Sequence, residues 1–300
     1  MYDCIIIGAG PAGLTAAIYL LRENKKIKII EKETIGGKIT SSARVDNYPA
    51  FKSISGSELA DKLFDQITNL GGEIDIEEMQ SIKDGKVKEV ITDEGRYQTK
   101  SIILATGTYF NTLKLDNEEK YLGNGISFCT VCDGAFYKNK VVAVIGGGNT
   151  AIINALYLST LAKKVYLIVR EDTVRGEKVN IDELLTKENI EIMYNSEVIE
   201  YLGDNSITGI TIKSKEETKN IAVDGIFLAI GQVPGTKEVN NLLKLDKYNY
   251  IEAKEDCKTN IAGIFVAGDV RSKKIRQLTT ATNDGTIAAL NVINYLDEGA

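Results

Sequence analysis

The sequence contains no histidine among its 300 residues. Imidazole is therefore excluded as a catalytic base and as a metal ligand. This removes Ser-His-Asp hydrolysis, Cys-His proteolysis and histidine-ligated metal sites from the possible functions. Any proton transfer must use a carboxylate, a tyrosine, a lysine, a cysteine or water.

Long apolar runs and blocks of basic residues are also missing. No segment approaches the ~20 apolar residues that span a bilayer, so we expect no membrane contact. The formal net charge is −6, with acids and bases mixed along the chain, which gives no footprint for nucleic acid. The N-terminal residues 1–7 have neither a basic region nor a cleavage pattern, and they lead directly into a glycine motif. We therefore expect a cytoplasmic protein.

Cysteine is scarce, with four residues in the whole chain. Cys129 and Cys132 form a Cys-x-x-Cys pair, and in a cytoplasmic protein this spacing indicates a redox-cycling disulfide rather than a structural one. Since no second pair is present, we predict no zinc or other metal site. Cys4 opens an apolar run and is expected to pack as a small apolar residue.

Asp133 follows the cysteine pair directly. Because the chain has no histidine, this carboxyl group is the natural candidate for the acid that protonates a departing thiolate. The sequence therefore predicts a catalytic set of Cys129, Cys132 and Asp133.

The chain repeats one pattern twice, as an apolar strand, a glycine motif, a helix and a second apolar strand. The first copy covers residues 4–30 and the second covers residues 142–169. Each half closes with another apolar strand, at 102–107 and at 226–231. The sequence therefore predicts an α/β protein with two Rossmann-like dinucleotide-binding domains. The two glycine motifs are Gly8-x-Gly10-x-x-Gly13 and Gly146-x-Gly148-x-x-Ala151.

A third apolar strand, at 264–269, follows the second domain and is left over. We expect it to return to the first domain, so that the second domain is inserted into the first. The predicted crossings between the domains lie at 113–123 and 231–238. The predicted boundaries are 1–113 with 242–300 for the first domain and 114–241 for the second.

The first glycine motif has the sequence context of a dinucleotide site. It follows a strand, opens a helix, and is followed 23 residues after Gly8 by Glu31 at a strand end. This spacing suits a carboxylate that accepts hydrogen bonds from an adenosine ribose. The alternative is a tight turn without a ligand. It carries more weight for the second motif, which has Ala151 in place of the third glycine.

Together these features resemble the low-molecular-weight thioredoxin reductases over nearly the whole chain. The element Cys129-x-x-Cys132-Asp133-Gly134 between two nucleotide folds is the specific part of the resemblance, and the glycines alone are not. The other matching segments are Gly36-Gly37, Ala105-Thr106-Gly107, Ala267-Gly268-Asp269-Val270-Arg271, Arg276-Gln277 and Asp284-Gly285.

The resemblance implies that FAD binds the first domain. Gly268-Asp269 would hold its ribityl–pyrophosphate region, and Arg276-Gln277 would lie beside the isoalloxazine and the disulfide. The second domain would bind a nicotinamide nucleotide. The FAD contacts expected in this way are Gly8, Gly10, Pro11, Ala12, Gly13, Glu31, Lys32, Gly37, Asn47, Thr106, Gly107, Gly268, Asp269, Arg276 and Gln277. The expected nucleotide contacts are Gly146, Gly148, Asn149, Thr150, Ala151, Arg170, Glu171 and Arg175.

The resemblance also implies a homodimer that reduces thioredoxin, with an inserted domain that rotates. Cys129 would attack the partner's disulfide, and Cys132 would face the flavin. Two alternatives stay open, which are a glutaredoxin-like or peroxidase-linked partner, and a flavin redox sensor without turnover. The retention of the cysteine element with both glycine motifs disfavours the sensor.

One segment departs from the family pattern. NADPH-using members carry H-R-R-x-x-x-R, where this chain has Val169, Arg170, Glu171 and, at the last position, Arg175. Glu171 would repel a 2′-phosphate and would suit a ribose hydroxyl, unless it only points to solvent beside the two arginines. Three electron sources are therefore open: poorly bound NADPH, NADH, or a protein donor such as ferredoxin. The intact second glycine motif argues against the last.

Overall fold

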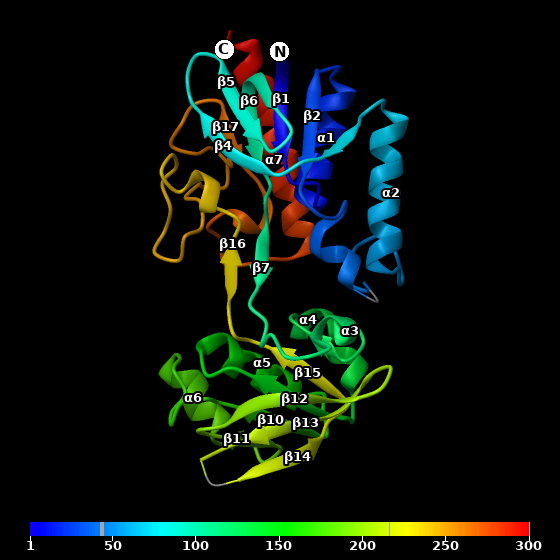
Figure 1. Ribbon diagram of the computed structural model, residues 1–300, viewed down its shortest axis with the longest axis vertical. Coiled ribbons are helices and arrows are strands. Elements are labelled where there is room, and N and C mark those ends of the chain that lie inside the picture. The colour runs from blue at the N-terminus through cyan, green and yellow to red at the C-terminus, as the bar shows by residue number, and fades with distance from the viewer. Residues whose placement is uncertain (43–44, 216, 300) are drawn as a thin grey trace. The chain divides into compact units, whose positions relative to one another are not determined.

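The computed structural model describes residues 1–42, 45–215 and 217–299, which form two compact units. Unit 1 joins Met1–Tyr109 to Val233–Ala300, and unit 2 is Phe110–Gln232. The chain crosses between them in β7 (Thr108–Phe110) and in β16 (Gln232–Pro234), which pair with each other (Figure 1).

The expected crossing at 231–238 contains β16, whereas the expected crossing at 113–123 lies inside unit 2. Glu118 explains why the segment 113–123 belongs to unit 2. Its buried carboxylate accepts the backbone N–H groups of Leu113 and Lys114 and the hydroxyl group of Tyr201. These bonds hold the segment, with its short helix α3 (Glu118–Tyr121), against unit 2.

Unit 1 is built on one mixed sheet with the strand order β3-β2-β1-β6-β5-β4, and β17 also pairs with β6. The strands β3, β2, β1, β6 and β17 are parallel along this sheet. Strand β6 pairs with β1 along one edge. Along its other edge, the first half of β6 pairs antiparallel with β5 and the last residues pair with β17. The bounds are β1 (Tyr2–Ile7), β2 (Ile27–Glu31), β3 (Ile74–Ile76), β4 (Met79–Lys83), β5 (Lys88–Thr92), β6 (Arg96–Leu104) and β17 (Ile264–Val266).

Strand β1 is buried on both faces, as expected for the centre of a parallel sheet. Cys4 and Ile6 point into one apolar core, while Ile5 and Ile7 point into the other. The first core contains residues of α1 (Pro11–Arg22) and α7 (Leu278–Asp297). The remaining helices are α2 (Gly56–Asn69) and the 3₁₀ helices η1 (Gly37–Ser41), η3 (Lys237–Val239) and η4 (Gly268–Val270). Across the described residues, no helix is both long and apolar enough to cross a membrane.

Unit 2 repeats this plan around a parallel sheet with the order β11-β10-β9-β15-β8. Strand β9 alternates like β1, with Val142 and Val144 in one core and Ala143 and Ile145 in the other. The predicted α/β class with two Rossmann-like folds is confirmed. The bounds are β8 (Ile126–Ser127), α4 (Thr130–Asp133), η2 (Gly134–Tyr137), β9 (Val141–Ile145), α5 (Asn149–Ser159), β10 (Lys164–Ile168), α6 (Lys178–Leu184), β11 (Ile190–Met193) and β15 (Gly225–Leu228). A separate antiparallel sheet is formed by β12 (Glu197–Gly203), β13 (Ile207–Lys213) and β14 (Thr218–Ala222).

A buried ion cluster fixes the turn after β17. The carboxylate of Asp284, which is 1% exposed, accepts two bonds from Arg271 at 3.0 and 3.1 Å. It also accepts a bond from Lys273 at 3.0 Å and one from the backbone N–H of Gly268 at 3.1 Å. One carboxylate on α7 therefore compensates two cations and orients the turn that begins η4.

Replacing Asp284 by alanine should destabilise unit 1 strongly, because Lys273 would lose its counter-charge and the buried Arg271 would keep only its 3.5 Å pair with the exposed Glu255. We expect a loss of about 3–5 kcal/mol in the free energy of unfolding, measured by urea titration of the apoprotein. Asp297→Ala is the matched control on the same helix, since its exposed pair with Lys25 should contribute about 0–1 kcal/mol. Equal losses in the two variants would contradict the assigned role of the cluster.

Candidate redox and nucleotide sites

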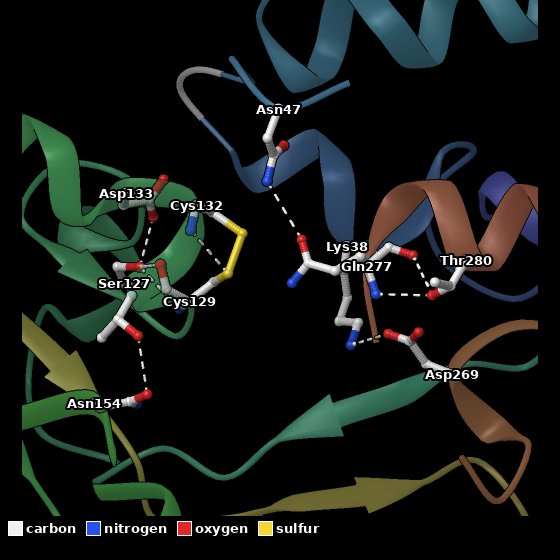
Figure 2. Close-up of a disulfide and its surroundings, with 11 residues drawn as sticks. Lys38, Asn47, Ser127, Cys129, Cys132, Asp133, Asn154, Asp269, Gln277 and Thr280 are labelled. Atoms are coloured by element: carbon white, nitrogen blue, oxygen red, sulfur yellow. Dashed lines mark hydrogen bonds and ion pairs between the residues drawn. A yellow bond between two sulfur atoms is a disulfide. The ribbon is translucent and has the colours of Figure 1, made fainter. Parts of the chain in front are cut away.

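The two cysteines of the Cys-x-x-Cys element form a disulfide in unit 2 (Figure 2). Cys129 caps the short helix α4, and its sulfur accepts the backbone N–H of Cys132. Between them, the buried Thr130 hydroxyl donates to Asn154 of α5 at 2.9 Å, while Val131 is 59% exposed. The turn is therefore anchored on one side and presents its other side to solvent.

Asp133 lies at the end of the same turn, and its carboxylate interacts with Ser127, a residue that the sequence analysis missed. The Ser127 hydroxyl donates to Asp133 Oδ2 at 2.5 Å and accepts the backbone N–H of Cys129 at 3.0 Å (Figure 2). Burial raises the pKa of Asp133 above the usual aspartate value, and the bond from Ser127 opposes this shift. Asp133 is therefore poised to keep its proton to higher pH than an exposed aspartate.

The other two cysteines are sealed inside unit 1. Cys4 and Cys257 are both 0% exposed, and burial raises the pKa of each thiol to about 12. Reactive thiols are accessible and have depressed pKa values, so neither residue is suited to exchange. Cys4 packs in the core beneath α1, as the sequence predicts.

The first glycine turn leaves one side open. Gly8 has φ +105°, and a Cβ on it would lie 2.3 Å from the carbonyl oxygen of Ala105. A Cβ on Gly13 would lie 1.9 Å from the carbonyl oxygen of Gly8, whereas one on Gly10 would meet none of the described atoms within 4 Å. Gly10 is the N-cap of α1, and no side chain in the described structure caps this end of the helix. The N-terminal N–H groups of α1 are thus available to an anion.

Two neighbouring segments complete this turn. The Glu31 carboxylate accepts the N–H of Ala9 at 2.7 Å, so its charge sits at the turn itself. Gly37 of η1 comes so close that a Cβ on it would lie 3.3 Å from the Cα of Gly10. The amino group of Lys32, another expected FAD contact, pairs with Glu33 and lies over the Tyr109 ring.

Asp269, on η4, has one carboxylate oxygen satisfied and one left over. Oδ2 pairs with the amino group of Lys38 at 3.2 Å (Figure 2). Oδ1 is buried and has no hydrogen-bond partner within the part of the chain that the structure describes. Lys38 was not identified from the sequence; its amino group also donates to Thr108, and burial lowers the pKa of Lys38. A buried acceptor of this kind calls for a donor from outside the chain.

Other expected FAD contacts of unit 1 bond to neighbouring segments of the same unit. Arg276 donates to the carbonyl oxygen of Asp269 at 3.1 Å, and its guanidinium lies over the ring of Tyr250. Asn47 donates to the side chain of Gln277 at 3.3 Å (Figure 2). Thr106 donates to the carbonyl oxygen of Gly235, and the next residue, Gly107, has φ +65°.

The second glycine turn has the same geometry as the first. A Cβ on Gly146 would lie 2.5 Å from the carbonyl oxygen of Ala229, and one on Gly148 would meet no described atom within 4 Å. Ala151 is fully buried and fills the place of the third glycine. The side-chain oxygen of Asn149 is already used, because it accepts bonds from the backbone of Glu177 and the side chain of Asn180. Thr150 is exposed at the start of α5.

The segment after β10 lies against this second turn. The N–H of Arg175 donates to the carbonyl oxygen of Gly147 at 2.7 Å, and a Cβ on Gly147 would lie 3.5 Å from Glu171 Oε2. Glu171 pairs with Arg170 at 3.6 Å and with Arg175 at 3.5 Å. Glu171 therefore faces the turn and does not simply point to solvent. It forms ion pairs with both surviving arginines.

The chain is similar to known proteins of one family. A model of the pyridine nucleotide-disulphide oxidoreductases matches residues 2–285. A thioredoxin reductase of Listeria monocytogenes is 40% identical, over 99% of this chain and 95% of that protein. The chain belongs to this family, among the low-molecular-weight thioredoxin reductases.

Two further relatives support the same assignment. The crystal structure of a thioredoxin reductase from Streptococcus pyogenes matches with a TM-score of 0.96 at 37% identity, over 99% of both chains. A "34.2 kDa protein in rubredoxin operon" of Clostridium pasteurianum is 41% identical, over 98% of this chain and 97% of that protein.

FAD is the cofactor that the family implies, and unit 1 fits it on two observations. The side of Gly10 is open where a pyrophosphate would approach the helix, and Asp269 Oδ1 is a buried acceptor that a ribityl hydroxyl group would satisfy. Among the described residues, no group of acidic and cysteine side chains could hold a metal ion.

Valine substitutions at the two open glycines should separate the two sites. Gly10 and Gly148 have extended backbones that valine tolerates, so both variants should fold. Gly10→Val should lose FAD, because its side chain would fill the approach to α1. Gly148→Val should keep FAD and lose any nicotinamide nucleotide. Absorbance of the purified proteins and nucleotide titration measure the two outcomes, and retention of FAD by Gly10→Val would contradict the assignment.

Serine substitutions should distinguish the two kinds of cysteine. Cys129→Ser and Cys132→Ser should each reduce disulfide turnover to background while FAD stays bound, because exchange needs both sulfurs. Cys4→Ser and Cys257→Ser are the controls and should keep activity. Steady-state reduction of thioredoxin measures all four, and normal turnover by either of the first two would overturn the role of the pair.

Proposed function

We propose that this protein is an FAD-dependent thioredoxin-disulfide reductase. Electrons would pass from a reduced donor through FAD to the disulfide of Cys129 and Cys132, and then to thioredoxin or a similar small redox protein. The observation that carries the proposal is the exchangeable disulfide beside a partly buried acid, in a chain with two open glycine turns. The relatives named thioredoxin reductase support thioredoxin as the partner.

Each of the two units would bind its own cofactor. Unit 1 would be the FAD domain, with Glu31 at the adenosine ribose, the N-terminus of α1 at the pyrophosphate and Asp269 at the ribityl chain. When bound, FAD supplies two-electron transfer between the donor and the disulfide. Unit 2 would be the nicotinamide-nucleotide-type domain, and it carries the redox turn.

The second step is thiol–disulfide exchange. Two electrons break the bond between Cys129 and Cys132, and the Cys129 thiolate then attacks one sulfur of the partner's disulfide. This forms a mixed disulfide and expels one partner thiolate. Cys132 attacks Cys129, which restores the original bond and expels the second partner thiolate. Asp133 is placed at this turn to supply a proton to a leaving thiolate, and its raised pKa suits that task.

The charges at the second turn support an electron donor other than NADPH. A 2′-phosphate carries close to two negative charges at neutral pH. Glu171 would repel it, and its carboxylate lies 3.6 Å from Arg170 and 3.5 Å from Arg175, where it offsets part of their positive charge. The same carboxylate, next to Gly147, suits a ribose diol. NADH therefore fits this site better than NADPH.

The function is tested by turnover with thioredoxin and each candidate donor. NADH, NADPH and reduced ferredoxin are supplied in parallel, and the reduction of the thioredoxin disulfide is followed. We expect turnover with NADH or ferredoxin that depends on bound FAD. If none of the three donors supports the reduction of thioredoxin or of a glutaredoxin, the proposed function is wrong.

The wild type should discriminate against NADPH. A charge-assisted hydrogen bond to a phosphate is worth about 1.5–3 kcal/mol, so NADPH should bind the wild type at least ~10-fold more weakly than it binds a double variant Val169→His, Glu171→Arg. Stopped-flow reduction of the flavin by each nucleotide measures the effect. Tight binding of NADPH and fast flavin reduction by NADPH in the wild type would contradict this prediction. If neither nucleotide reduces the flavin in either protein, a protein donor such as ferredoxin replaces NADH in the proposal.

A further inference from the structure

Ser127 forms a link in unit 2 that the reaction above leaves without a role. Its single hydroxyl donates to Asp133 Oδ2 at 2.5 Å and accepts the backbone N–H of Cys129 at 3.0 Å. The residue is 7% exposed, so water does not replace either bond. Figure 2 shows the Asp133 carboxylate directed at this hydroxyl.

We propose that Ser127 is a positioning residue for disulfide exchange, which holds the Asp133 carboxyl against the backbone of Cys129 so that the acid serves the redox turn. The inference rests on the proposed function, because it takes Asp133 as the proton donor. Ser127 lies in β8, and Asp133 lies at the end of α4. The bond therefore also ties the end of the redox helix to the sheet of unit 2.

The surroundings of Asp133 leave Ser127 as the side chain that tunes it. Burial raises the pKa of Asp133, and the hydroxyl of Ser127 lowers it by stabilising the carboxylate. From η2, Tyr137 stays neutral, since burial raises its pKa to about 12. Helix α5, which packs on the turn through Asn154, carries no Asp, Glu, Lys or Arg, and the ring of its Tyr157 lies beside Gly134, the residue after Asp133. The thiols of Cys129 and Cys132 themselves are the other titratable groups of the turn.

The direction of the effect of losing Ser127 follows from these charges. Asp133 is active as an acid below its pKa, and it loses its proton as pH rises through that pKa. Without the hydroxyl group the carboxylate is less stable, so the pKa of Asp133 rises further and deprotonation occurs at higher pH. An ionised Asp133 also disfavours a nearby thiolate, so its titration is visible in the reactivity of the reduced cysteines.

The experiment measures alkylation of the chemically reduced holoprotein by iodoacetamide across pH, with Cys129 and Cys132 quantified by mass spectrometry. Ser127→Ala should move the lower inflection of the profile upward by roughly one pH unit. Ser127→Thr, which keeps the hydroxyl group, should restore the wild-type position. In an Asp133→Asn background, Ser127→Ala should cause no further shift, because the group through which it acts is gone.

Thr130→Val is the matched control. It removes the other side-chain bond of the same turn, to Asn154, without touching Asp133, and should leave the inflection in place. A profile of Ser127→Ala that coincides with the wild type, or a shift of equal size in the Asp133→Asn background, would overturn the positioning role. Thioredoxin turnover is assayed separately on the same variants. A shifted alkylation profile without any thioredoxin reduction would support Ser127 and reject the proposed function, whereas normal turnover with an unshifted profile would do the reverse.

Discussion

The close approach of a strand end to the turn of a neighbouring glycine is the constraint on which both units depend. At Gly8 and at Gly146, a carbonyl oxygen of the adjacent strand, from Ala105 or Ala229, fills the space that any side chain would need. This contact brings the first strand, the first helix and the closing strand of each unit together. It also leaves the next motif glycine, Gly10 or Gly148, facing open space at a helix N-terminus. Folding and the proposed phosphate recognition thus depend on the same turn, which occurs once in each unit.

Patterns of short period and fixed spacing made the architecture predictable from the sequence. The continuous apolar runs of β1 and β9, and the spacing from Gly8 to Glu31, are local properties of the sequence that packing reinforces. The crossing at Tyr109–Phe110 was placed too late because the bonds that hold residues 113–118 to unit 2 converge on the buried carboxylate of Glu118. A polar residue in a polar stretch gives no sign of such burial before the chain is folded.

The candidate site divides in the same way. Cysteine spacing and the following aspartate pointed to the redox turn, and the turn exists as a disulfide next to a partly buried acid. Ser127 and Lys38 escaped notice because a serine or lysine is ordinary in sequence, and its meaning lies in the atom it reaches. For Lys38 that atom belongs to Asp269, which is 231 residues away along the chain. The roles of these side chains are therefore a property of the packed chain.

The burial of Cys4 and Cys257 determines which cysteines of the protein can react with oxidants. Of the four cysteine sulfur atoms, only the pair in unit 2 can change partners, since the other two are sealed in a close-packed core. A peroxide or disulfide stress would therefore return the protein to its own resting disulfide. It would not drive internal scrambling or crosslinking between molecules through a third thiol. Oxidation is in this sense self-limiting, and recovery depends on a single bond that the catalytic cycle itself opens.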